Sequence, residues 1–181
     1  MDHPRLATVW LGGCSGCHMS FLDLDEFLID LARKVEVVYS PVADVKEYPD
    51  KVDVCLVEGA VCNRDHLEMI HKIRDRTRLI ISFGDCAVTG NVSALRNPLG
   101  AADQVLRRAY VEGADIAAGI PNEPGIVPPL LDRVMPVHEV VSVEYYLPGC
   151  PPPAERIRAV LEGLLGSGAP PPLTGTMIKF G

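Results

Sequence analysis

Three features that this sequence lacks narrow its class. It has no basic excess, because its formal net charge is −7, so nothing in it resembles the basic surface of a nucleic-acid-binding protein. No apolar run approaches the roughly 18–20 residues that a membrane-spanning helix needs. The first residues form neither a charged and then apolar signal segment nor a twin-arginine pair, so we expect no export and a cytoplasmic location.

The composition is that of a folded globular protein. Of the 181 residues, 48% are hydrophobic and 23% charged, which favours a real core over disorder. We expect one domain over residues 1–181, with 169–181 as a C-terminal surface tail. Six cysteines are present. In a reducing compartment, grouped cysteines bind metal or carry out redox chemistry more often than they form disulfides.

Apolar strand-like runs alternate with amphipathic segments along the chain. Short β-rich runs predict strands at 5–11, 35–39, 52–57, 79–83 and 140–147. Helical periodicity predicts helices at 19–34, 64–76, 101–111 and 154–165, and the proline- and glycine-rich stretch 119–136 is expected to be loop. This alternation predicts a three-layer, doubly wound α/β fold close to flavodoxin, with a mostly parallel five-stranded sheet.

Four cysteines follow the ends of predicted strands. Cys14 and Cys17 follow the first strand, Cys86 follows the fourth and Cys150 follows the fifth. Because parallel strands end at one edge of a sheet, these four cysteines should meet there. Four thiolates suit either a [4Fe–4S] cluster or a tetrahedral zinc ion.

The spacing of the four cysteines favours iron–sulfur over zinc. Structural zinc sites usually contain two C-x-x-C pairs, whereas this chain has one pair and two single cysteines. Glycines stand beside each cysteine position and allow backbone N–H groups to approach sulfur closely. Zinc, and four unrelated buried cysteines, remain as alternatives.

The same segments resemble the small subunit of [NiFe] hydrogenases, and most closely the soluble NAD-reducing type. The resemblance covers about residues 5 to 165 and rests on Gly12-Gly13-Cys14-Ser15-Gly16-Cys17-His18, Glu58-Gly59, Gly84-Asp85-Cys86-Ala87 and Pro148-Gly149-Cys150-Pro151-Pro152. It implies that Cys14, Cys17, Cys86 and Cys150 hold one proximal [4Fe–4S] cluster. The chain would then be the electron-relay subunit of a hydrogen:NAD⁺ oxidoreductase, without a hydrogen-activating site of its own.

The resemblance also implies partners. The nickel–iron site would lie on an obligate large subunit, and NAD and FMN on diaphorase subunits that carry further iron–sulfur clusters. The chain ends soon after Cys150 and lacks the cysteine- and histidine-bearing extension of respiratory small subunits. The related quinone-reducing subunit has two adjacent cysteines in its first loop, whereas Ser15 and Gly16 separate Cys14 from Cys17 here. A quinone- or ferredoxin-linked complex, or a free flavodoxin-like carrier, remains as an alternative function.

Other residues near the expected site have less defined roles. Glu58 ends the third predicted strand and could orient the cluster loop or contact a partner; a solvated carboxylate is equally expected. Cys62 and His18 could surround the cluster or be ordinary structural residues, and Cys55 should be a core residue. Thr89-Gly90-Asn91 resembles a flavodoxin phosphate loop, but it does not open the first strand–helix unit, so we do not expect this chain to bind flavin.

Overall fold

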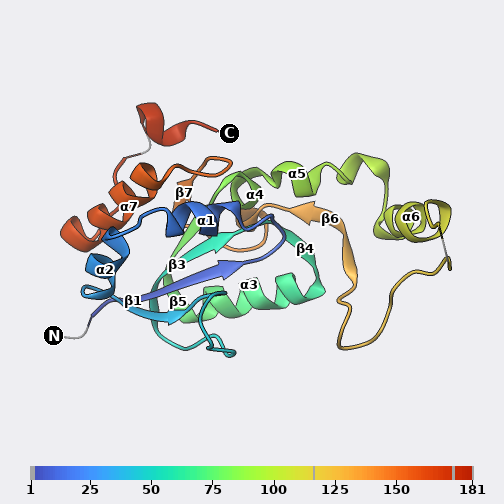
Figure 1. Cartoon of the computed structure of the whole chain (residues 1–181), viewed down its shortest axis with the longest axis horizontal. Helices are drawn as coiled ribbons and strands as arrows, with labels where there is room; N and C mark the ends of the chain where they lie inside the picture. Colours follow the sequence, from blue (N-terminus) through green and yellow to red (C-terminus); the bar gives the residue numbers. More distant parts are fainter. Residues whose placement is uncertain (1–2, 116, 173, 181) are drawn as a thin grey trace.

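The structure is a computed structural model that describes residues 3–115, 117–172 and 174–180. A central sheet is covered by helices on both faces (Figure 1). The sheet strands are β1 (Arg5–Trp10), β2 (Glu36–Tyr39), β3 (Val52–Glu58), β5 (Thr77–Phe83) and β7 (Tyr145–Leu147), and a separate pair is formed by β4 (Val61–Asn63) and β6 (Leu130–Met135). The α-helices are α1 (Gly16–Leu22), α2 (Phe27–Ala32), α3 (Arg64–Arg76), α4 (Asp85–Thr89), α5 (Asn91–Ala94), α6 (Ala102–Arg107) and α7 (Ala154–Ser167). A π-helical turn lies at Arg108–Glu112, and 3₁₀ turns lie at Asn97–Leu99, Val137–Glu139 and Gly175–Ile178.

The central sheet confirms the predicted fold class. Its strand order is β2-β1-β3-β5-β7, and every neighbouring pair is parallel. Counting only these five strands, the order is 2-1-3-4-5, which is the flavodoxin-like order. The order reverses between β1 and β3, and this is where folds of the class collect their ligands at the carboxyl ends of the strands.

Two apolar clusters lie on opposite faces of the sheet. On one face, Leu56 and Ile81 pack with Ile157 of α7 and with apolar side chains of α1 and α2. On the other face, Cys55 and Ile80 pack with side chains of α3. Since successive strand residues point to opposite faces, a strand buried on both sides must be apolar along its whole length. This explains the continuous apolar runs in the sequence.

The predicted helix over 19–34 is wrong in its middle. The structure has two short helices, α1 and α2, with turns between them. Asp25 has a φ of 49°, which an α-helix cannot contain. Backbone bonds of the i→i−3 type, such as Asp25 N–H to Leu22 O at 3.2 Å, occupy the break. The break turns Leu24 into the core, where its side chain is buried.

Two further predictions need correction near the end of the chain. The segment expected to be loop contains β6, which pairs antiparallel with β4. A strand of three residues, such as β4, is too short to show periodicity. The strand expected over 140–147 is reduced to β7, because the Glu144 side chain accepts the Ile80 N–H at 2.7 Å where a strand carbonyl would.

The last residues contact the main body of the chain. The Tyr145 hydroxyl donates to the carbonyl of Pro171 at 2.6 Å, and the Arg156 guanidinium donates to the carbonyl of Lys179 at 2.8 Å. Met177 packs against the core cluster that contains α7. Within the described residues, no helix is long and apolar enough to cross a membrane.

Candidate metal centre

The carboxyl edge of the sheet brings the four cysteines together. Cys14, Cys17, Cys86 and Cys150 line one cavity of about 70 Å³, together with Gly16, Glu58, Asp85, Gly149 and Pro151. Cys17 is buried and Cys86 half-buried, whereas Cys14 and Cys150 are exposed. The cavity therefore has a protein-covered side and a side open to solvent or to another chain.

The thiols of the cavity influence one another electrostatically. Burial raises the pKa of the Cys17 thiol, and the charges of Glu58 and of Cys86, Cys14 and Cys150 raise it further. Burial also raises the pKa of Cys86, followed by the charges of Cys150 and Cys14. Without a cationic group these sites favour neutral thiols, so the set can be deprotonated together only when positive charge binds among them.

Close packing behind Cys17 requires a glycine. Gly84 has a φ of +85°, and a Cβ placed there would lie 2.1 Å from the Cys17 sulfur. This is less than any normal carbon–sulfur contact. Because Gly84 ends β5, it lets the loop that carries Cys86 approach the loop that carries Cys17.

Glu58 is buried beneath the first cysteine loop. Its side chain is 2% exposed, so a solvated end-of-strand carboxylate is the wrong description. It accepts the backbone N–H of His18 at 2.9 Å and that of Cys17 at 3.4 Å. It also pairs with Nδ1 of His18. The carboxylate therefore orients the loop that carries Cys14 and Cys17.

His18 and Cys62 lie on different sides of this loop. His18 is buried in α1 with its ring edge-on to Phe83, and among the residues described here its Nε2 has no hydrogen-bond partner. Cys62 is half-buried, and its sulfur lies 3.4 Å from the carbonyl oxygen of Ala60. It is not among the residues that line the cysteine cavity. Cys55 is fully buried in the core, as predicted.

Two residues at the cavity were missed by the sequence analysis. Asp85 is buried and accepts the backbone N–H of Gly149 through Oδ1 at 2.6 Å. Its only signal was an acidic residue placed between Gly84 and Cys86. Asn91, considered above only as part of a phosphate loop, donates from Nδ2 to the Cys150 sulfur at 3.4 Å.

The residues present fit an iron–sulfur cluster. Four thiols come from three separate strand ends, and a side-chain amide already donates to one of the sulfurs. Four sulfurs around one zinc ion, each at about 2.3 Å from it, would stand about 3.8 Å apart. In the described part of the chain, no three His, Cys, Asp or Glu side chains lie close enough to hold a single ion. The sulfurs are thus spaced more widely than the ligands of one ion.

The fold and this set of cysteines define a known class. The family described as NADH ubiquinone oxidoreductase, 20 Kd subunit, matches residues 14–164, so the chain belongs to that family. The delta subunit of the NAD-reducing hydrogenase HoxS from Cupriavidus necator is 38% identical over 180 residues, covering 97% of this chain and 85% of that one. A crystal structure of an NAD⁺-reducing [NiFe]-hydrogenase in the H₂-reduced state contains a chain of 38% identity that superposes with a TM-score of 0.92, covering 99% of this chain and 100% of that one.

A second group of relatives is longer. One subunit of the F420-non-reducing hydrogenase vhu of Methanococcus voltae is 45% identical over 168 residues, which is 90% of this chain but only 58% of the relative. The chain therefore spans little more than half the length of this relative. The resemblance to hydrogenase small subunits that the sequence motifs indicated is confirmed by these relatives.

Proposed function

We propose that Cys14, Cys17, Cys86 and Cys150 hold one [4Fe–4S] cluster, and that the chain relays electrons as the small subunit of a soluble NAD-reducing [NiFe] hydrogenase. The observation that carries this proposal is the convergence of the four cysteines on one cavity from three strand ends. A bound cluster would supply reversible one-electron transfer. The residues of the chain would hold it, orient it and shield it from solvent on the buried side.

The proposed partners follow from the names of the relatives. The delta subunit of HoxS belongs to an NAD-reducing hydrogenase, and this chain covers most of its length. We therefore place the nickel–iron site on an obligate large subunit, and NAD and FMN on diaphorase subunits in the cytoplasm. This chain would form a single electron-transfer domain over residues 1–181, without flavin and without a site that activates hydrogen.

A second candidate is the cluster-bearing subunit of a quinone- or ferredoxin-linked complex. The family takes its name from a ubiquinone oxidoreductase, which supports this alternative. Against it, Ser15 and Gly16 separate Cys14 from Cys17, and the superposed NAD⁺-reducing hydrogenase chain is covered over its full length. The electron acceptor separates the two candidates: NAD⁺ in the first, a quinone or ferredoxin in the second.

The first experiment is purification of the tagged chain with whatever binds to it, under anaerobic conditions. We expect a nickel-containing large subunit, FMN-containing partners, and iron with acid-labile sulfide. One zinc per chain without sulfide would instead support a zinc-stabilised interaction module. Flavin bound to the isolated chain without iron would support a flavodoxin-like carrier.

The relay role is tested by two assays on one preparation. In the Cys150→Ser complex, hydrogen-driven NAD⁺ reduction should be lost because electrons cannot cross from the nickel–iron site to the flavin without the cluster. NADH-driven dye reduction should remain, since it needs only the diaphorase. An equal fall of both activities in a fully assembled complex would contradict the relay role.

A further inference from the structure

Asp85 connects the two cysteine loops that are far apart in sequence. Its backbone N–H donates to the carbonyl of Gly149 at 2.9 Å, and its Oδ1 accepts the N–H of Gly149 at 2.6 Å. Asp85 directly precedes Cys86, and Gly149 directly precedes Cys150. Each end of this reciprocal pair is thus one residue away from a proposed ligand.

The side chain of Asp85 continues a ladder that the backbone cannot continue. β5 and β7 pair as far as Phe83 and Leu147, and Gly84 N–H then donates to Leu147 O at 2.8 Å. At Asp85 the chain turns into α4, so no further β5 carbonyl can face the N–H of Gly149. The carboxylate oxygen takes that place. Because the side chain is only 6% exposed, water does not compete strongly for this bond.

The same carboxylate places a negative charge at the cavity. Asp85 lines the cavity with the four cysteines. A fixed negative charge in a poorly solvated place favours the less negative, oxidised form of a neighbouring redox group. It also occupies the Gly149 N–H, a donor that could otherwise turn toward a cluster sulfur and favour the reduced form.

The geometry points to Asp85 as a positioning residue that holds Cys86 and Cys150 in register and whose carboxylate lowers the reduction potential of the cluster between them. This inference rests on the proposed cluster. It separates two contributions of one side chain: the hydrogen-bond acceptor, which an asparagine keeps, and the charge, which an asparagine removes.

The experiment compares three variants of the full chain in the complex that co-purifies with it: Asp85→Asn, Asp85→Ala and the control Asp53→Asn. Asp53 is a matched control because its carboxylate also accepts a backbone N–H across the fold, from Arg5 at 2.8 Å, but at the opposite edge of the sheet. Iron, acid-labile sulfide and the midpoint potential of the cluster, from a redox titration followed by electron paramagnetic resonance, are measured for each.

We expect Asp85→Asn to keep wild-type iron and sulfide and to shift the midpoint potential to a more positive value. Asp85→Ala should lose iron and sulfide, because it removes the acceptor as well as the charge. Asp53→Asn should match wild type in all three measurements. An unchanged potential in a fully loaded Asp85→Asn complex would overturn the inference, as would full iron in Asp85→Ala or loss of iron in Asp85→Asn. A wild-type complex whose chain holds no cluster would overturn the proposed function itself.

Discussion

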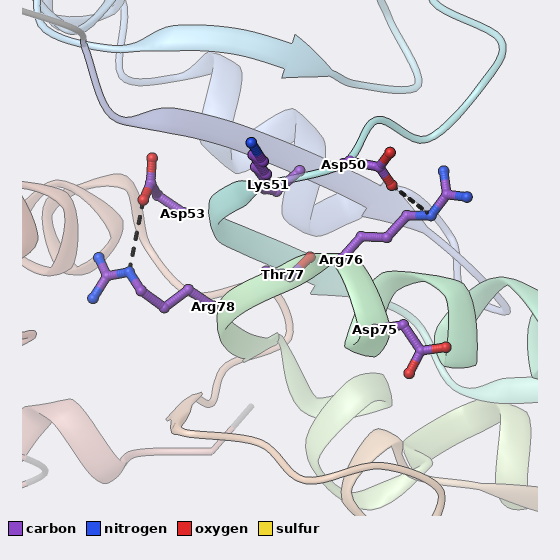
Figure 2. A pocket seen from close by; sticks show the side chains of 8 residues that line it. Asp50, Lys51, Asp53, Asp75, Arg76, Thr77 and Arg78 are labelled. Atoms are coloured by element: carbon purple, nitrogen blue, oxygen red, sulfur yellow. Dashed lines mark ion pairs between the residues drawn. The ribbon is translucent and has the colours of Figure 1, made fainter.

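The two edges of the central sheet use acidic residues in opposite ways. At the carboxyl edge, Glu58 and Asp85 are buried and accept backbone N–H groups of the cysteine loops. At the amino edge, Asp50 pairs with Arg76 at 3.0 Å and Asp53 pairs with Arg78 at 3.6 Å. Figure 2 shows these pairs on either side of Lys51 and Thr77, in a hollow of about 500 Å³.

The difference between the edges lies in solvation. The side chain of Asp50 is 75% exposed, so water screens its ion pair and the pair adds little stability. Glu58 is almost fully buried, so its hydrogen bonds act in a poorly solvated place and their loss leaves donors without partners. We therefore expect substitutions at the carboxyl edge to affect both stability and the proposed cluster, and those at the amino edge to affect neither appreciably.

The largest expected effect is loss of the cluster from Cys86→Ser. Serine is a harder and poorer ligand for iron than cysteine, so iron and acid-labile sulfide should fall to background. Cys55→Ser is the matched control, because Cys55 is fully buried in the core away from the cavity. It should lower the free energy of unfolding and keep the iron. Retention of iron by Cys86→Ser together with its loss from Cys55→Ser would refute the ligand assignment.

The next largest effect is expected from Glu58→Ala. The change removes the acceptor of the Cys17 and His18 N–H groups and leaves His18 buried without its partner. Breaking a buried pair of this kind typically lowers the free energy of unfolding by about 3–5 kcal/mol. Chemical denaturation followed by circular dichroism measures it. The control Glu36→Ala removes a carboxylate that is 65% exposed and should change the value by less than about 1 kcal/mol. Equal effects of the two variants would remove the distinction between buried and exposed acids.

A smaller effect is expected from Gly84→Ala. The added methyl group would clash with the Cys17 sulfur, and the backbone conformation strongly favours glycine, which together should lower stability by about 1–3 kcal/mol and reduce iron content. Gly166→Ala is the control within α7, where a new Cβ meets nothing within 4 Å. It should raise stability by up to about 1 kcal/mol. Wild-type iron content and stability in Gly84→Ala would show that the approach of the two loops is not required.

The smallest effect is expected at the amino edge. Asp50→Asn removes one partner of the ion pair with Arg76, and stability should change by less than about 1 kcal/mol because the pair is solvated. The change should shrink further in high salt, which screens exposed charges. Denaturation at low and high salt provides the measurement. A loss as large as that of Glu58→Ala would show that the two edges do not differ as described.

The sequence predicted much of the fold because strong local patterns coincided with long-range packing. The helix predicted over 64–76 has the bounds observed for α3, which begins at the Asn63 cap, where the side chain accepts the N–H of His66 at 2.8 Å. The predicted strands at 52–57 and 79–83 lie within β3 and β5, because both are buried on two faces and therefore apolar throughout. The break near Asp25 was missed, since helical periodicity continues across it.

The sequence by itself determined the placement of the four cysteines at one edge of a parallel sheet. That result needs only strand ends and the common direction of the strands, both of which are local information plus one topological rule. The tertiary structure alone decided how the carboxylates beside those cysteines are used. Glu58 and Asp85 could not be told from solvated acids in the sequence, because burial and hydrogen-bond partners depend on loops from β1 and β7 that reach them only in the folded chain.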